Sequence, residues 1–205
     1  MSSNSNIIAL TMGDPSGVGT EIAIRAKIKK IKKPDFFIIH DIDFVKKILK
    51  KMKSKLKVRE ISSPSEVKKL PKNYLAVLPI KISKNTQLGK KNLSNVKSIL
   101  TSIDLAVKLA KNGEVAAIVT NPINKDVIGK KVKNFKGHTE YLAKKDRTND
   151  QLMMMMNKNL KTIPLTTHIA INKVSNKINK KNITNAIVET SKRSEPKGKS
   201  VASPV

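Results

Sequence analysis

The chain has three histidines, whose imidazole side chains could bind a metal or transfer a proton near neutral pH. His138 stands beside Thr139 in "NFKGHTEYLA", where the pair could hold a substrate, or where Thr139 could simply be the N-cap of a helix that begins at Glu140. His168 follows two threonines in "LTTHIAI" at the expected end of a strand, where it could be a metal ligand or a half-buried structural histidine. His40, at another strand end, is expected to be structural.

Two polar loops could bind a ligand beside these histidines. "GDPSGVG" (13–19) lies between an expected strand and an expected helix, where α/β proteins usually bind their ligands. Its glycine spacing matches neither the dinucleotide fingerprint nor a P-loop, so a purely structural turn stays an alternative. "TNPINK" (120–125) offers Asn121, Asn124 and Lys125 to an anionic group, although a turn with proline and asparagine needs no functional reason.

Short apolar runs alternate with amphipathic helical patterns, which is typical of an α/β fold with a parallel sheet covered by helices. Strands are expected over residues 6–12, 35–41, 57–61, 74–80 and 114–120, with short apolar runs of strand length at 151–156 and 161–169. Helices are expected after the glycine loop, over 43–56, over 93–113 and from near Thr184. Ser94 is the expected N-cap of the 93–113 helix, and Gly113 its expected end.

The basic composition is compatible with phosphate-bearing partners but does not indicate a dedicated nucleic-acid binder. The chain of 205 residues has a formal net charge of +27, yet its basic residues are mostly lysines scattered from Lys27 to Lys199. Aromatic residues make up only 3%, whereas base stacking and bidentate base recognition need aromatics and arginines. We therefore expect no specific nucleic-acid partner and interpret the lysines as a compositional bias on solvated surfaces.

The remaining composition limits the chemistry and the location. With no cysteine, a metal site would depend on histidines and carboxylates. An apolar run of about 18 residues that could span a membrane is absent from the sequence, and the first residues lack the pattern of a signal peptide. The sequence therefore predicts a cytoplasmic protein without a membrane partner.

Five motifs in one order resemble those of the 4-hydroxythreonine-4-phosphate dehydrogenase family of pyridoxal phosphate biosynthesis. They are "TMGDPSGVGTEI", "AAIVTNPINKDVI", "FKGHTEYLA", "MMMM" and "LTTHIAI", and the resemblance extends from about Ile7 to Val188. It implies a homodimeric, NAD-dependent enzyme with a three-layer α/β/α architecture of two lobes, similar to isocitrate and isopropylmalate dehydrogenases. The resemblance also implies an active site in the cleft between the lobes.

The resemblance implies a reaction and a set of site residues. The secondary hydroxyl of 4-(phosphooxy)-L-threonine would be oxidised by hydride transfer to NAD, and the β-keto acid would lose carbon dioxide to give 3-amino-2-oxopropyl phosphate. His138 and Thr139 match the substrate-binding pair, and His168 matches a ligand of the divalent metal, which could be zinc, magnesium or cobalt. Asp14 would face the cleft, Lys125 lies in a polar loop whose role is open, and the catalytic residues are unknown.

The sequence departs from the family pattern after residue 190. The family's other metal histidines, and the lysine, asparagine and arginine that grip its substrate, have no match, so we expect the C-terminal part of the fold to be missing through truncation or frameshift. The expected parts are an N-terminal lobe (1–120), the beginning of a second lobe (121–190) and a disordered or unrelated tail (191–205). This chain alone would then have little activity. The alternatives are a non-catalytic fragment or binding module for phosphorylated small molecules, and nonspecific nucleic-acid binding.

Overall fold

The computed structural model describes residues 6–29, 34–147, 152–157, 159–167 and 169–194. The chain divides into two compact units, with the boundary between Asp146 and Arg147. The lobe boundary expected near residue 120 concerns the complete family fold and stays a prediction.

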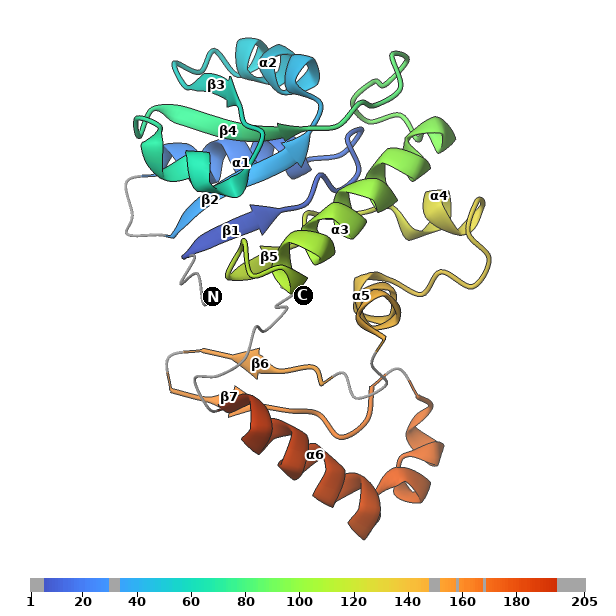
Figure 1. Ribbon diagram of the computed structural model, residues 1–205. Helices are drawn as coiled ribbons and strands as arrows, with labels where there is room; N and C mark the ends of the chain where they lie inside the picture. The colour runs from blue at the N-terminus through green and yellow to red at the C-terminus, as the bar shows by residue number, and fades with distance from the viewer. Residues whose placement is uncertain (1–5, 30–33, 148–151, 158, 168, 195–205) are drawn as a thin grey trace. The chain divides into compact units, whose positions relative to one another are not determined.

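The first unit is built on a five-stranded parallel sheet with the strand order β3-β4-β2-β1-β5 (Figure 1). Its strands are β1 (Ile7–Leu10), β2 (Asp35–His40), β3 (Lys57–Glu60), β4 (Tyr74–Pro79) and β5 (Ala117–Val119). The inner strands β2 and β4 are almost continuous apolar runs, as expected where helices cover both faces. The edge strand β3 is polar and mostly exposed, which discourages pairing with another chain.

Helices cover both faces of this sheet, so the predicted parallel α/β fold is confirmed as a three-layer arrangement (Figure 1). One face packs against α1 (Gly19–Ile28) and α2 (Ile42–Lys51). The other face packs against α3 (Val96–Lys111), with the 3-10 helix η1 (Pro64–Lys69) and α5 (His138–Asp146) beside it.

Alternation along the strands divides the core between the two faces. In β2, Phe37 and Ile39 pack in the cluster that contains Ile103 of α3. Ile38, between them, packs in the opposite cluster with Ile24 of α1. A third cluster joins α3 to the short helix α4 (Lys125–Gly129) at the end of the sheet that carries the polar loops.

The ends of α3 confirm one expectation and correct another. Gly113 follows the helix with a φ of +76°, a left-handed conformation that glycine adopts without strain, as predicted. Ser94 is not the N-cap, because a 3-10 turn, η2 (Leu93–Asn95), precedes the helix. The side chain of Asn92 caps that turn by accepting a hydrogen bond from the Ser94 amide, and Asn95 occupies the N-cap position of α3.

Helix α5 begins two residues earlier than expected. His138 is its first residue, so Thr139 lies inside the first turn and is not the N-cap of a helix that begins at Glu140. The backbone of Gly137 accepts a hydrogen bond from the Tyr141 amide, which extends the helical pattern upstream of the predicted start.

The second unit contains an antiparallel pair, β6 (Met155–Met156) and β7 (Lys161–Thr162), then η3 (Ile171–Lys173), η4 (Ser175–Lys177) and α6 (Lys180–Ser194). The two strands are shorter than the predicted runs at 151–156 and 161–169. Helix α6 starts at Lys180 instead of near Thr184, because the Asn179 side chain accepts a hydrogen bond from the Asn182 amide and caps it. The expected tail overlaps the end of α6, and residues 195–205 lie outside the described ranges.

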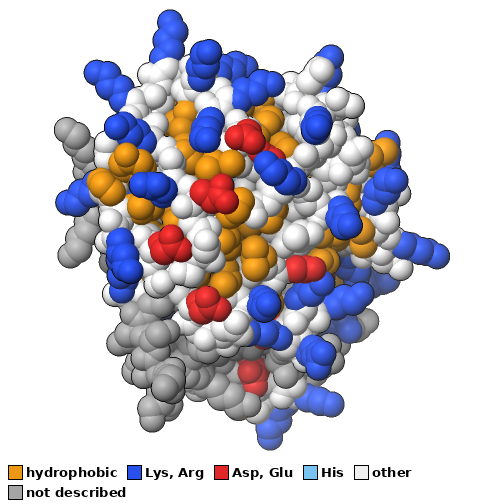
Figure 2. Space-filling model, turned by 45° about the horizontal axis from the view of Figure 1, so that its top comes forward, with side chains coloured by type: hydrophobic (Ala, Val, Ile, Leu, Met, Phe, Trp, Pro, Cys, Tyr) orange, Lys and Arg blue, Asp and Glu red, His pale blue; other side chains and the backbone are white. Residues whose placement is uncertain are grey.

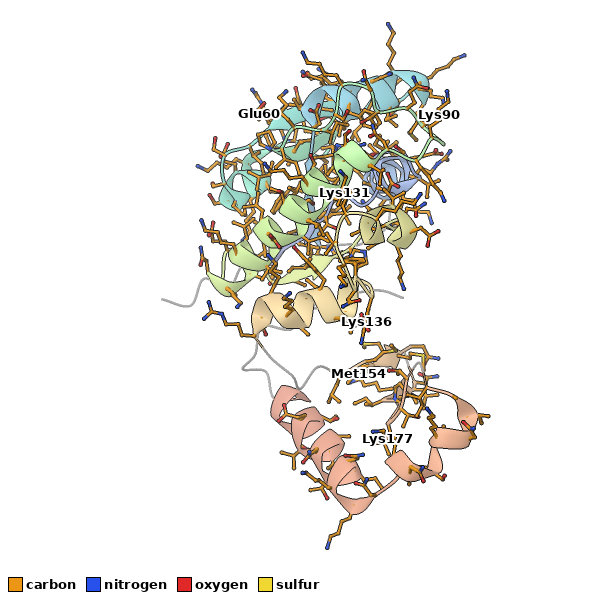
Figure 3. The ribbon with its side chains drawn as sticks, turned by 90° about the vertical axis from the view of Figure 1, so that its right-hand side faces the viewer. Glu60, Lys90, Lys131, Lys136, Met154 and Lys177 are labelled. Carbon is orange, nitrogen blue, oxygen red and sulfur yellow. The ribbon has the colours of Figure 1, made fainter. Side chains whose placement is uncertain are left out.

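Apolar side chains of the second unit remain exposed. Met154, labelled in Figure 3, is 41% exposed, and Ile171 is 90% exposed. Among the described residues from 152 to 191, none is classed as buried. Across the described ranges of both units, the helices are too short or too polar to cross a membrane.

Candidate functional site

The candidate site lies at the carboxyl edge of the parallel sheet, where the strand order changes direction. From β1 the chain proceeds to β2 on one side, and it later returns to place β5 on the other side. The loop after β1 leads into α1 on one face, and the loop after β5 leads into α4 beside α3. Such a switch point is where open α/β sheets bind their ligands.

The glycine-rich loop packs directly on the loop that follows β5. The Asp14 amide donates to the carbonyl oxygen of Pro122 at 2.8 Å. A Cβ atom on Gly13, which has a φ of +68°, would lie 2.6 Å from that oxygen. A Cβ atom on Gly19 would lie 3.1 Å from the Cβ atom of Asn121. These two glycines therefore allow the close approach of two backbones, in addition to any role near a ligand.

Asn121 and Asn124 have structural roles, although the sequence indicated both as possible anion-binding residues. Asn121 is buried, its side-chain Nδ2 donates to the Thr11 carbonyl at 3.0 Å, and its amide donates to the Thr11 hydroxyl at 3.2 Å. Asn124 caps α4 by accepting from the Val127 amide at 3.1 Å. Of the polar side chains predicted in this loop, only the exposed Lys125 is left to meet an anion.

His138 is held by the same loop. Its Nε2 lies 3.2 Å from the carbonyl oxygen of Asn121, and because a carbonyl only accepts hydrogen bonds, this nitrogen carries the proton. Burial lowers the pKa of His138, the bond to Asn121 opposes that shift, and the positive charge of Lys125 adds to it. The ring is therefore neutral near neutral pH, with the buried Nδ1 unprotonated and without a partner in the structure.

Lys125 and Thr139 lie beside the first turn of α5. A Cβ atom on Gly137 would be 3.2 Å from Cε and 3.3 Å from Nζ of Lys125, so the ammonium group sits against the residue that precedes the helix. Thr139 is exposed in this turn, and Lys136, labelled in Figure 3, directly precedes Gly137. Helix amide groups, a hydroxyl and an ammonium group suit an oxyanion such as phosphate or carboxylate. The Glu140 carboxylate opposes this attraction, since its Oε2 would lie 3.6 Å from the same Cβ atom.

The Asp14 side chain stabilises the turn of the glycine loop that leads into α1. Its Oδ1 accepts from the Ser16 amide at 2.9 Å, and the side chain is half-buried. The Ser16 carbonyl accepts from the Gly89 amide at 2.7 Å, which ties the loop to the segment before α3. The structure thus places Asp14 in the same set of loops as Lys125 and His138.

His40 has a structural role, as the sequence suggested. It is fully buried, its Nδ1 accepts from the Asp41 amide at 2.7 Å, and its Nε2 pairs with the Thr20 hydroxyl at 2.9 Å. Its ring stacks on Phe44 with the centroids 5.6 Å apart. Burial lowers the pKa of His40 to about 4, so the ring is neutral and joins α1 to the end of β2.

The described residues contain no cluster of three candidate metal ligands. His168, the predicted metal ligand, lies outside them. In the ranges that the structure describes, no three histidine, cysteine, aspartate or glutamate side chains gather as a metal-binding group. His138 and His40 already use one or both ring nitrogens in contacts within the fold.

The basic side chains do not gather into one patch on the surface that Figure 2 shows, where they surround apolar areas. A cavity of about 1270 Å³, lined by Arg25, Lys27, Lys29, Lys55 and Lys72 among others, lies near the amino end of β2, away from the candidate site. Three of these cations, Arg25, Lys27 and Lys29, are at the carboxyl end of α1, where they complement the helix dipole. The end of α1 therefore accounts for part of the charge of the cavity.

Sequence reasoning missed several residues that build this site. The hydrogen bond of Asn121 to Thr11 and that of His40 to Thr20 join segments that are distant in the sequence, so no local pattern reveals them. Gly13 could have been recognised, because a glycine directly after a strand often marks a left-handed turn or a close backbone approach.

Comparisons with known proteins agree with the motifs. The family profile described as "Pyridoxal phosphate biosynthetic protein PdxA" matches residues 32–200. A 4-hydroxythreonine-4-phosphate dehydrogenase of Trichlorobacter lovleyi is 33% identical over 170 residues, which cover 80% of this chain and 50% of that protein. The enzyme of the same name from Methylorubrum populi is 32% identical over 185 residues, which cover 85% and 52%.

Solved structures support the same relationship. The 4-hydroxythreonine-4-phosphate dehydrogenase of Klebsiella pneumoniae superimposes with a TM-score of 0.83 at 27% identity, covering 94% of this chain and 61% of that one. A terephthalate 1,2-cis-dihydrodiol dehydrogenase of Burkholderia xenovorans shares the fold, with a TM-score of 0.63 at 17% identity. The chain spans about half the length of the curated relatives that it matches. With its motifs, its fold and most of its length matched, this chain belongs to the PdxA family of pyridoxal phosphate biosynthetic proteins.

Proposed function

We propose that the complete protein is an NAD-dependent dehydrogenase that oxidises 4-(phosphooxy)-L-threonine in pyridoxal phosphate biosynthesis. The observation that carries this proposal is the convergence of the glycine loop, Lys125, His138 and Thr139 at the switch point of the sheet. The names of the relatives support the substrate class, because they are 4-hydroxythreonine-4-phosphate dehydrogenases.

In this reaction the carbon that bears the secondary hydroxyl loses a hydride to NAD, and the hydroxyl proton is released. The resulting β-keto acid loses carbon dioxide and becomes 3-amino-2-oxopropyl phosphate. A divalent metal would stabilise the negative charge that develops on the oxygen in both steps. Because the described residues form no metal site, we assign the metal no geometry here.

The residues of this chain have binding roles in the proposal. Lys125 and the first turn of α5 attract an anionic group of the substrate, and the exposed hydroxyl of Thr139 donates to it. His138 stays neutral beside them, because burial and Lys125 both lower its pKa. Asp14 orders the glycine loop that lines the same edge.

Several features of the proposal belong to the complete family fold. We propose a two-lobed arrangement like that of isocitrate and isopropylmalate dehydrogenases, with residues 1–120 in the first lobe and 121–190 at the beginning of the second. We further propose a cytoplasmic homodimer, NAD as the oxidant, and His168 as one ligand of zinc, magnesium or cobalt.

A polypeptide of these 205 residues alone is expected to have little activity, because the family's other metal histidines and substrate-gripping residues have no match in it. The test is an assay of the purified chain with 4-(phosphooxy)-L-threonine, NAD and a divalent metal. NADH formation at the rate of an ordinary full-length dehydrogenase would contradict this expectation.

Substrate binding can be tested without turnover. Calorimetric titration of 4-(phosphooxy)-L-threonine is expected to show binding that weakens about tenfold, or about 1.4 kcal/mol, in Lys125→Met. The matched control is Lys130→Met, which removes an exposed lysine at the other end of α4. Equal affinity in both variants would exclude Lys125 from the site. In a repeat with zinc or magnesium, substrate affinity that rises with the metal would support a metal-dependent enzyme over a simple phosphate-binding module.

A further inference from the structure

Helix α5 must be held in place by the rest of the fold if His138 is to face the switch point. The helix has nine residues, and a helix of this length is marginal in isolation. Its buried residues are Leu142 and Ala143. Leu142 and the partly buried Tyr141 ring pack against the main core cluster, and polar contacts add direction to this packing.

Asp104 of α3 supplies these contacts with both carboxylate oxygens. Its Oδ1 accepts from the Tyr141 hydroxyl at 2.9 Å, and its Oδ2 accepts from Lys145 Nζ at 2.7 Å. Hydrogen bonding to Asp104 raises the pKa of Lys145, and burial is the largest cause that raises the pKa of Tyr141, so both groups remain donors near neutral pH. Lys145 Nζ also lies 5.2 Å from the centre of the Tyr141 ring.

The two donors lie on the same side of α5 as His138. Residues 138, 141 and 145 are separated by three and four positions, which is the spacing of one helical face. A rotation of α5 by one residue would turn this face by about 100° and break both bonds to Asp104 as well as the His138 bond to Asn121. One carboxylate on α3 thus fixes the rotation that presents the imidazole.

The contact is suited to orientation more than to stability. The side chains of Lys145 and Asp104 are 38% and 40% exposed, and ion pairs with that exposure contribute little to the free energy of folding. Lys111 of α3 also contacts the end of α5, through the Lys145 carbonyl at 3.0 Å and Asp146 at 3.3 Å. Removal of Asp104 should therefore leave α5 attached but less firmly fixed in its rotation.

We propose that Asp104 is a positioning residue for His138, acting through Tyr141 and Lys145 to set the rotation of α5. It does not touch the substrate, and its effect on ligand affinity rests on the proposed function. Its effect on His138 does not, because the hydrogen bond to Asn121 is present without any ligand.

The test compares Asp104→Ala with Asp43→Ala in the full chain. Asp43 is the matched control. It lies on α2, far from α5 in sequence, and its carboxylate pairs with Lys46 and Lys81. Long-range proton–nitrogen NMR spectra report which ring nitrogen of His138 carries the proton. In the wild type and in Asp43→Ala we expect one tautomer with the proton on Nε2, and in Asp104→Ala a mixture of the two.

An unchanged His138 signal in Asp104→Ala would overturn the proposal. If that variant does not fold, Tyr141→Phe keeps the ring and removes one of the two bonds, and it should shift the His138 nitrogens in the same direction by a smaller amount. Identical His138 spectra in Tyr141→Phe and the wild type would then overturn it.

A titration with inorganic phosphate separates this proposal from the proposed function. Weaker phosphate binding in Asp104→Ala than in Asp43→Ala, by about threefold to tenfold, supports a positioned binding group. If the wild type binds no phosphate but Asp104→Ala still changes the His138 tautomer, the positioning role stands and phosphate recognition at this site is wrong.

Discussion

Gly13 and His40 show how single residues at the carboxyl edge decide whether the loops of the site can form. Gly13 brings the glycine loop within contact of Pro122, and His40 joins the end of β2 to α1 through Thr20. Neither residue needs to touch a ligand. Both are therefore best tested through the stability of the fold.

Replacement of Gly13 should be costly because of a backbone contact as well as its φ. Gly13→Ala would place Cβ 2.6 Å from the Pro122 carbonyl oxygen, and we expect a loss of roughly 3 kcal/mol or failure to fold. Gly89→Ala is the control, because Gly89 has a φ of +78° but nothing within 4 Å of the new Cβ, so only about 1 kcal/mol should be lost. Urea unfolding measures both. Equal losses would show that the close approach contributes nothing.

The buried His40 should make stability depend on pH. Its pKa is lowered from 6.5 to about 4 in the folded chain, so below pH 6.5 the unfolded chain binds a proton that the folded chain does not. The stabilisation is complete above pH 6.5 and falls between pH 6.5 and about 4, by an amount on the order of 3 kcal/mol.

Urea unfolding at several pH values, with His40→Gln beside the wild type, tests this dependence. Between pH 6.5 and 4, the free energy of unfolding of this variant should fall less steeply with decreasing pH than that of the wild type. His138→Gln is the comparison. Burial also lowers the pKa of His138, but its ring is less buried than that of His40. Most of the pH dependence of the free energy of unfolding should therefore remain in His138→Gln. Parallel curves for His40→Gln and the wild type would contradict the assignment.

Helix α2 illustrates the scale of elements, because one side chain both begins the helix and holds a neighbouring segment. Asp41 accepts from the amides of Asp43 and Phe44 at the N-terminus of α2, and its other oxygen accepts from the Ile82 amide at 3.3 Å. Asp41 therefore links α2 to the segment after β4.

Asp41→Ala should destabilise the chain by about 1 to 2 kcal/mol through loss of the helix cap and of the Ile82 contact. Asp41→Asn keeps an oxygen at the cap and should recover most of that loss. Denaturant unfolding of the two variants is the measurement. If both variants lose the same free energy, charge rather than capping explains the role of Asp41.

The elements themselves were largely predictable, whereas their ends were not. Alternating apolar runs and helical patterns indicated every strand and the long helices of the first unit, because those patterns follow directly from burial. Ser94 failed as the predicted N-cap because Asn95 takes that position, and the alternative of Thr139 as an N-cap is excluded because the helix begins earlier. The pairing of Asp104 with Tyr141 joins residues 37 positions apart, and no local pattern could reveal it.

At the scale of the whole molecule, the sequence predicted the parallel sheet but not its strand order. The order β3-β4-β2-β1-β5 decides that the loops after β1 and β5 meet, and it depends on packing between segments far apart in the chain. The family resemblance indicated His138 and Thr139 as a pair and named the glycine loop and Lys125 with them, and the structure adds the contacts that join these segments.

The buried residues predict that the first unit folds independently. Every residue classed as buried in the described ranges lies at or before Ala143. A chain that ends at Asp146 should therefore keep a cooperative thermal transition within a few degrees of the full chain. Differential scanning calorimetry measures both chains. Loss of the cooperative transition would show that residues after Asp146 are required for the core.

The most direct test of the account is an NMR titration of the chain with 4-(phosphooxy)-L-threonine, followed through the backbone amides. The account predicts shifts concentrated in the loop after β1, at Lys125 and in the first turn of α5 around His138 and Thr139. The same titration of Thr139→Val should show smaller shifts at these positions. Shifts that avoid this edge of the sheet, or binding that is unchanged in Thr139→Val and Lys125→Met, would contradict it.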